Sequence, residues 1–374
     1  KPNNWGEVFD YWGQILNLLV EAITKEDDYS NLIFDVIVDN VLGLIRSGYV
    51  ENMDQSLKII FDKRNNYWPE FIGKINLILR FDGSKMPKKA VDLIKSWEER
   101  LQPQDTVAKI KLLVSSANND YAENKDKSSG SKYRDVALDR IDELLEDIYP
   151  QKMEELKSNL SVLLIGEQKQ AFYFGKQLLN KMSDQEKHDF LDLVYLEIKE
   201  LISSKEKQEL NMNFLGGILS SIQLSKPDLF KKFLIQIDNT PYAYILVELI
   251  RYIEVDKDIL NSLLENVQKS IITVDSLIAL AYGPALSNIN EDDLISFLEP
   301  LYSLDEGFNQ VVAWKIYYRF YLNNQEITNE ISKCIVHFLE NSFSILSEQS
   351  ISYEVIDILT QLYNSEFVDK ENLS

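Results

Sequence analysis

Apolar residues recur every three or four positions along most of this chain, which is the spacing of one face of an α-helix. Clear stripes of this kind run through residues 8–19, 32–44, 138–148, 191–198 and 260–267. Each stripe gives a helix one face to bury against a neighbour, with polar residues on the other side. The pattern therefore predicts an all-α protein.

Helix-capping residues divide the second half of the chain into segments of similar length. Ser183, followed three residues later by Glu186, has the form of a capping box. Six further candidate caps precede apolar segments: Ser225, Thr240, Asp256, Thr273, Asn290 and Asp305. One helix about every 16 residues makes a helix pair of about 33 residues, a period typical of stacked helical repeats. We expect antiparallel helix pairs stacked into a curved, HEAT-like α-solenoid without a significant β-sheet.

Residues 118–135 break this pattern. The segment reads NNDYAENKDKSSGSKYRD and is polar, with few apolar residues and the flexible run Ser128–Ser131. Such composition is typical of a loop or linker. We therefore expect an N-terminal helical segment at 1–117 and a C-terminal helical-repeat segment at 136–374. The alternative is a long loop within one continuous superhelix.

Composition supports a folded helical protein. Of the 374 residues, 45% are hydrophobic and only 13 are glycine and 9 proline, so the chain can fill a core but has few turn residues. A single cysteine excludes an intrachain disulfide and fits a reducing, cytoplasmic location. No run of about 18 uncharged apolar residues predicts a membrane span. Since the sequence begins at Lys1 rather than at methionine, we expect it to be a piece of a longer protein.

The net charge of −21 is concentrated near the end of the sequence. Residues 233–374 hold 7 basic and 22 acidic residues, a net charge of −15. A field of this sign repels nucleic-acid phosphates and anionic membrane surfaces, and it suits a basic protein partner. The alternative is that the charges only solvate helix faces.

Catalytic and metal-binding signatures are scarce. The two histidines, His188 and His337, each stand alone on a predicted helix, and one cysteine cannot form a thiolate zinc site. Cys334 and His337 share a helix face, but the apolar residues around them favour core packing over a nucleophilic pair. No phosphate-binding or dinucleotide-binding glycine motif is present. The sequence thus predicts no catalytic residue, no cofactor and no metal.

An aromatic face is the strongest candidate for a binding surface. Trp314, Tyr317, Tyr318 and Tyr321 fall on one face of a predicted helix, with two basic residues near the other side. Aromatic residues of this kind can anchor a peptide or stack bases, and they also fill the core between helices. Core packing and a protein-binding groove both remain open, and nucleic acid is disfavoured. We take these four residues as candidate protein-binding residues.

Gly216 and Gly217 lie inside an apolar helical pattern. Each weakens a helix by about 1 kcal/mol relative to alanine, so we expect a structural reason for them. Close approach of a neighbouring helix, or a kink, is the expected reason.

Three short motifs within residues 160–300 carry a resemblance to a known group of proteins. They are Leu163-Leu164-x-Gly166 followed by Phe174-Gly175, then Asn213-Phe214-Leu215-Gly216-Gly217-Ile218-Leu219, and finally Leu277-x-x-Leu280-Ala281-Tyr282-Gly283. Together they resemble the helical C-terminal regions of large bacterial anti-phage proteins, including STAND-type ATPases and sirtuin-linked relatives. In that group such regions are sensors or scaffolds, and the effector chemistry lies in another domain. The resemblance implies a regulatory part of a bacterial defence protein.

Taken together, these patterns favour a non-catalytic module that recognises a protein partner through an extended helical surface. Other domains of a longer parent chain are expected beside it. Two alternatives stay open: a structural oligomerisation scaffold, and an enzyme with an unfamiliar helical site built around His188 or His337.

Overall fold

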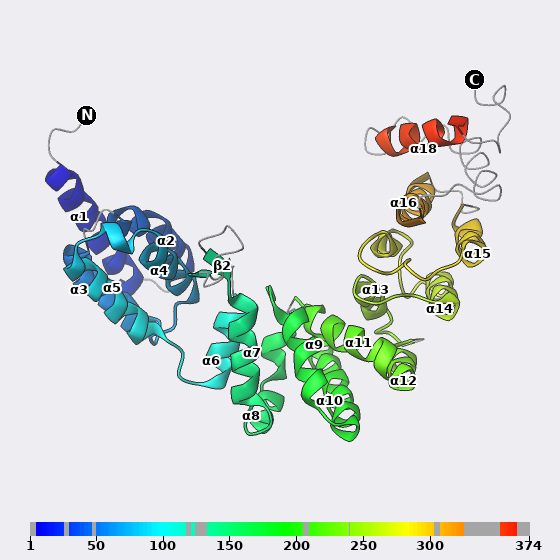
Figure 1. Ribbon diagram of the computed structural model, residues 1–374, viewed down its shortest axis with the longest axis horizontal. Helices are drawn as coiled ribbons and strands as arrows, with labels where there is room; N and C mark the ends of the chain where they lie inside the picture. Colours follow the sequence, from blue (N-terminus) through cyan, green and yellow to red (C-terminus); the bar gives the residue numbers. More distant parts are fainter. Residues whose placement is uncertain are drawn as a thin grey trace. The chain divides into compact units, whose positions relative to one another are not determined.

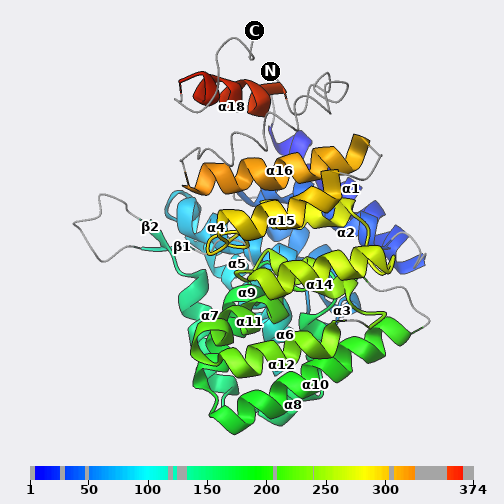
Figure 2. The same ribbon diagram turned by 90° about the vertical axis from the view of Figure 1, so that its right-hand side faces the viewer.

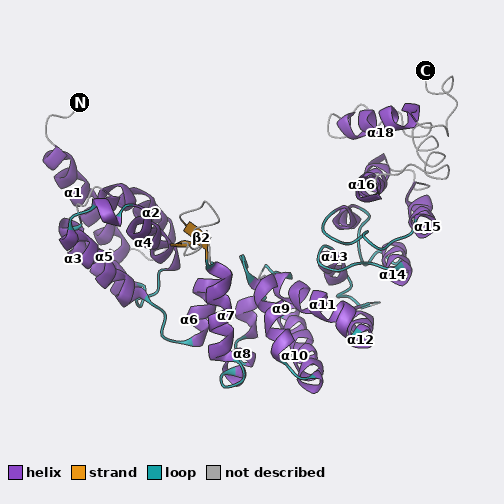
Figure 3. Ribbon diagram, viewed as in Figure 1, coloured by secondary structure: helices purple, strands orange, loops and turns teal. Residues whose placement is uncertain are grey.

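A computed structural model describes residues 5–25, 30–46, 50–116, 121–123, 133–204, 209–238, 240–302, 307–324 and 352–364 (Figure 1). Helices dominate these residues, and the strands among them form one short antiparallel pair (Figure 3). The predicted helical fold is therefore confirmed. The chain divides into two compact units, Lys1–Phe214 and Leu215–Ser374, and each is described by itself.

The first unit is built from short and medium helices. Its elements are α1 (Trp5–Lys25), α2 (Ser30–Arg46), η1 (Glu51–Met53), α3 (Asp54–Lys63), α4 (Pro69–Phe81), η2 (Gly83–Lys85), α5 (Lys88–Leu101), α6 (Thr106–Ile110), the π-helical turn η3 (Lys111–Ser115), β1 (Tyr121–Glu123), β2 (Tyr133–Asp135), α7 (Ala137–Ile148), α8 (Met153–Lys157), η5 (Leu160–Leu163), α9 (Ala171–Lys181) and α10 (Asp184–Ser203). Helix α11 (Asn213–Ser225) begins in this unit and continues into the second.

An aromatic cluster forms the centre of the first part of this unit. The rings of Trp68 and Phe71 stack with centroids 4.8 Å apart, and Phe61 and Trp97 pack against Phe71 at 5.7 and 6.4 Å. All four side chains are buried, and they come from α3, α4, α5 and the residue before α4. Offset and tilted rings of this kind favour dense packing. The aromatic cluster holds the inner face of α4 against the core and does not cover the opposite face of that helix.

The segment predicted as a loop or linker, 118–135, contains a strand near its start and one at its end. Tyr121 lies opposite Asp135 and Glu123 opposite Tyr133 in the antiparallel pair. Strand β1 also contacts α4. The segment lies within the first compact unit, and the division between the units falls after Phe214.

The second unit continues with helices. Its elements after α11 are α12 (Pro227–Ile237), α13 (Tyr244–Ile250), α14 (Lys257–Gln268), η6 (Asp275–Ala281), α15 (Glu291–Tyr302), α16 (Gly307–Asn324) and α18 (Ser352–Asn364).

Neighbours in the sequence pack on one another in the second unit. Helix α12 contacts α13, α14 contacts α15, and α15 contacts α16, while the 3₁₀ segment η6 packs against both α13 and α16. Figure 2 shows α12, α14, α15 and α16 as successive rows. Gly216 has a structural reason of the expected kind, because a β-carbon there would collide with the ring of Tyr252, which lies in the turn after α13.

Candidate functional site

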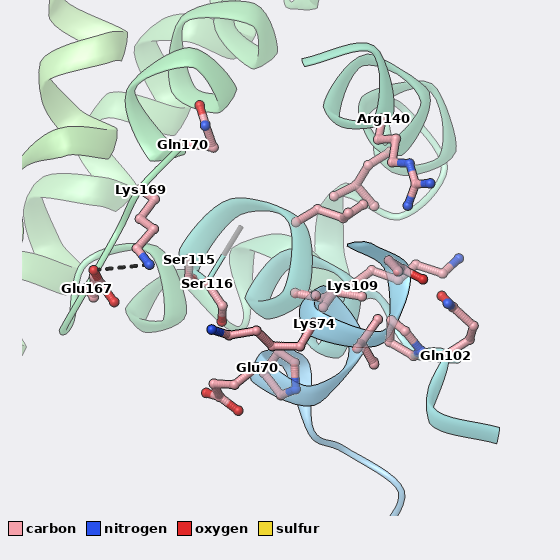
Figure 4. A pocket seen from close by; sticks show the side chains of 18 of the residues that line it. Glu70, Lys74, Gln102, Lys109, Ser115, Ser116, Arg140, Glu167, Lys169 and Gln170 are labelled. Atoms are coloured by element: carbon pink, nitrogen blue, oxygen red, sulfur yellow. Dashed lines mark ion pairs between the residues drawn. The ribbon is translucent and has the colours of Figure 1, made fainter. Parts of the chain in front are cut away.

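A groove of about 1630 Å³ lies on the first unit (Figure 4). Its lining comes mainly from α4, α7, the π-helical turn η3 and the segment 167–170. Residues from α2, from α6 and from the connection between α5 and α6 complete it. The groove is formed inside one compact unit, so its geometry does not depend on the position of the other.

Helix α4 presents one regular face to the groove. Gly73, Lys74 and Leu77 lie three, four and seven residues after Glu70, a spacing that places all four on the same side of the helix. Ile75 and Ile78 point into the core and are fully or almost fully buried. The amphipathic pattern of this helix thus separates a packed inner face from a mixed polar face at the groove.

Helix α7 contributes its own face by the same spacing. Arg140 lines the groove together with Glu143, Leu144 and Asp147, which follow it by three, four and seven residues. Three of these four side chains are charged. The fully buried residues Ile141, Leu145 and Ile148 hold α7 to the core, and Leu144, which is 4% exposed, lies between this buried face and the groove.

The turn η3 lies in the lining as a π-helix rather than a regular helix. The backbone N–H of Ser116 donates a hydrogen bond to the carbonyl oxygen of Lys111, five residues earlier, at 2.9 Å. Such turns are rare and are found frequently at functional sites. The end of the turn is joined to the segment 167–170, because the N–H of Lys169 donates to the carbonyl of Ser115 at 3.2 Å.

Gln168 holds the segment 167–170 in place from inside the protein. Its side chain is only 2% exposed. The Nε2 amide donates to the carbonyl oxygens of Val162 and Ile165, each at 2.8 Å, and Oε1 accepts from the hydroxyl of Ser115 at 3.1 Å. The backbone carbonyl of Gln168 accepts a further bond from Asn213 at 2.6 Å. A buried polar side chain with all of these partners specifies one backbone conformation.

Two of the four basic side chains that line the groove, Lys109 and Lys169, form ion pairs with acidic residues. Lys109 Nζ lies 3.1 Å from Asp147 Oδ2, and Lys152 binds the same carboxylate at 2.8 Å. Hydrogen bonds from Lys152 and Lys109 lower the pKa of Asp147. Lys169 forms an ion pair with Glu167 at 3.4 Å, drawn as a dashed line in Figure 4. These pairs keep this part of the lining close to neutral.

Two charged side chains of the lining make no hydrogen bond or ion pair with any residue that the structure describes. One is Lys74 on α4, which is half-buried, and the other is Glu143 on α7, which is exposed. They carry opposite charges and come from different helices. The arrangement can therefore accept both a negative and a positive group from a bound chain.

The aromatic residues that the sequence singles out lie in the second unit, on α16. Trp314 and Tyr317 are 1% and 2% exposed, so both side chains are packed in the interior of that unit. Tyr318 is half-buried, and its hydroxyl donates to Asp357 on α18 at 3.2 Å. Tyr321 belongs to α16, but its side chain lies outside the described residues. The burial of Trp314 and Tyr317 fits the core interpretation, and a protein-binding role for this face stays a prediction.

The reactive groups considered in the sequence do not meet in the described residues. His188 lies half-buried on α10, whereas Cys334 and His337 lie outside the described residues. Among the described residues, no three histidine, cysteine or acidic side chains are placed to hold a metal ion. Nor does any described helix have both the length and the apolar character that a bilayer crossing requires.

The comparisons add no family to this picture. Searches against family models, curated proteins and solved structures find no match for the chain.

Proposed function

We propose that this chain is a non-catalytic module for protein recognition, and that the groove of the first unit binds an extended segment of a partner protein. The observation that carries the proposal is the groove itself. Its volume of about 1630 Å³ exceeds the roughly 300–1,000 Å³ of pockets that enclose a small molecule. A polypeptide segment several residues long is a better match for a groove of this size.

The chemistry of the lining supports a polypeptide over a nucleic acid. The groove has basic residues on α4, α6, α7 and the segment 167–170, and each of the two larger helices also contributes carboxylates. The apolar part of its lining is aliphatic, as at Leu77, Leu112 and Leu144, and the described lining residues include no aromatic ring. Single-stranded nucleic acids are bound by basic grooves with aromatic platforms, whereas the described lining of this groove mixes basic and acidic side chains.

The stacked helical architecture, the role in a defence protein and the basic character of the partner are part of the same proposal. Packing between sequence neighbours in the second unit supports a HEAT-like stack of helices, since each helix of such a stack buries its face against the next. The motifs within 160–300 suggest a sensor or scaffold region of a bacterial anti-phage defence protein. The acidic residues of 233–374 favour a partner with basic surface as well.

A peptide-display selection tests the proposal. Random linear dodecapeptides displayed on phage are selected on the immobilised full chain, and the enriched peptides are synthesised. We expect the Leu77→Arg variant, which places a charged side chain in the groove, to weaken their binding at least tenfold. Leu196→Arg is the matched control, because Leu196 is 54% exposed on α10 and does not line the groove.

Circular dichroism confirms that both variants keep their helical content. Enrichment of no peptide, or equal binding by the wild-type chain and Leu77→Arg, would contradict the proposal.

A further inference from the structure

Gly73 has no packing reason to be a glycine. It lies in the middle of α4, where glycine weakens a helix relative to alanine, and a β-carbon there would meet no atom within 4 Å. Gly175 on α9 differs, because a β-carbon there would lie 2.5 Å from the carbonyl oxygen of Phe214. The open space over Gly73 belongs to the groove. A glycine at such a point allows another backbone to approach the helix closely.

Lys74 is next to Gly73 in the sequence and also lines the groove. In Figure 4 its side chain extends toward the side of the view on which Glu167 and Lys169 lie. Lys169 and Lys109 have ion-pair partners, whereas the ammonium group of Lys74 has none among the described residues. A lysine in a groove without an acidic partner among the described residues favours binding of an anionic group, which forms a charge-assisted hydrogen bond with it.

Glu143 supplies the opposite charge on α7. Its carboxylate also has no partner among the described residues, and it shares the groove with Lys74. A purely anionic ligand such as a phosphate backbone would be attracted at Lys74 and repelled at Glu143. The lining therefore favours a ligand that carries both charges.

We propose that the groove recognises an extended peptide segment whose backbone packs over Gly73, with an acidic side chain at Lys74 and a basic side chain at Glu143. This inference rests on the proposed function, and it adds the chemistry of the bound segment. Charge complementarity at two points also fixes the direction in which the segment lies, because reversing it would place like charges together.

Charge reversal on each helix tests the two charged contacts separately. The dodecapeptide selection is repeated on the full-length wild type, Lys74→Glu and Glu143→Lys. We expect wild-type binders to share one acidic and one basic position. The acidic position should change to basic on Lys74→Glu, and the basic position to acidic on Glu143→Lys. Lys95→Glu, an exposed site on α5 outside the groove, should select the wild-type pattern.

Replacement of Gly73 tests the backbone contact. Gly73→Ala should raise the midpoint temperature of unfolding, because alanine favours the helix and the site is open. Binding of the selected peptides should fall at least fivefold. Gly13→Ala on α1 is the matched control, because a β-carbon at Gly13 also meets nothing within 4 Å but the residue is outside the groove. That variant should gain stability and bind normally.

The outcomes separate the two proposals. Selected peptides could bind more weakly to Leu77→Arg and yet show the same charged positions on wild type, Lys74→Glu and Glu143→Lys. That result would contradict this inference and leave the proposed function standing. Unchanged binding by Gly73→Ala, or a lower midpoint temperature, would also overturn it. Equal competition by an oligonucleotide of random sequence would indicate a nucleic-acid groove and contradict both proposals.

Discussion

The backbone N–H of Gln170 donates a hydrogen bond to the carbonyl oxygen of Val114 at 2.9 Å. This bond joins the end of the π-helical turn to a segment more than fifty residues later in the sequence. Two parts of the groove lining, the turn η3 and the segment 167–170, are thus joined by a backbone hydrogen bond. This part of the groove lining is therefore held by backbone hydrogen bonds as well as by side-chain contacts.

Removal of the buried amide of Gln168 should destabilise the first unit. Gln168→Leu keeps much of the side-chain volume but leaves the carbonyls of Val162 and Ile165 without their donors. The expected loss is about 2–4 kcal/mol in the free energy of unfolding by urea, since each buried unsatisfied group costs about 1–3 kcal/mol. Gln55→Leu on the exposed side of α3 is the control and should change it little. A loss below about 0.5 kcal/mol for Gln168→Leu would contradict the assigned role.

The first unit should lose stability at alkaline pH through Tyr67. Burial, followed by the negative charge of Glu70, raises the pKa of Tyr67 from 10.0 to about 12. Because the folded-state pKa exceeds the unfolded one, this contribution to stability is complete below pH 10 and is lost as the pH rises through 12.

Tyr67→Phe should therefore reduce the fall in unfolding free energy between pH 10 and 12, measured by urea titration at each pH. Part of the fall should persist, because the pKa of Tyr318 in the second unit is also raised to about 12, first by burial. Tyr11→Phe, at a side chain that is 60% exposed, serves as the control. An identical pH profile for wild type and Tyr67→Phe would show that the tyrosine is not buried as described.

Trp314 should act mainly through packing. Trp314→Ala removes a side chain that is 1% exposed, and the expected cost is about 3–5 kcal/mol for unfolding of the second unit in calorimetry. Tyr318→Phe removes only the bond to Asp357, so its cost should be about 0.5–1.5 kcal/mol. An unchanged unfolding transition for Trp314→Ala, together with lost partner binding, would instead favour the exposed protein-binding face.

The capping box at the start of α10 should contribute measurably to stability. The hydroxyl of Ser183 accepts from the N–H of Glu186, while the Glu186 carboxylate accepts from the N–H of Ser183 at 2.7 Å. Ser183→Ala should cost about 0.5–2 kcal/mol in urea unfolding. Ser183→Asp should recover most of this loss, because aspartate is an equally good cap. Failure of aspartate to recover it would show that the loss has another cause.

The first residues of helices were predictable from the sequence where the N-terminal capping bond is local. The box at Ser183 and the caps at Asp256 and Asn290 are confirmed, because each side chain bonds a backbone N–H three residues ahead. The prediction at Ser225 is wrong: its hydroxyl donates to the carbonyl four residues earlier at 2.7 Å, and the residue ends α11. Serine can make either bond, so the sequence alone cannot choose. Asp305 lies outside the described residues.

The groove was not predictable from periodicity, because it depends on which helix faces remain uncovered after packing. Two local signals point toward it in retrospect. One is Gly73 within the apolar pattern of α4, and the other is the charged spacing of Arg140, Glu143 and Asp147 on α7. Neither signal reveals that the two helices line the same groove. That relationship comes from tertiary packing.

The aromatic face of α16 shows a second limit of the sequence. Trp314 and Tyr317 alternate with buried aliphatic residues such as Val312 and Ile316, so buried apolar side chains lie on most sides of the helix. Such a pattern gives too weak an amphipathic signal to separate the core face of the helix from a binding face. Only the burial of Trp314 and Tyr317 in the folded unit shows which residues of the helix pack in the core.

The central claim is that the groove on the first unit binds the partner segment, and methyl NMR tests it most directly. In the full chain with labelled leucine and isoleucine methyl groups, a selected peptide should shift the signals of Leu77, Leu112 and Leu144, which line the groove. The signals of Leu224 and Ile235, which are 83% and 73% exposed on α11 and α12, should stay unchanged. Shifts confined to Leu224 and Ile235, with none at the groove leucines, would contradict the account.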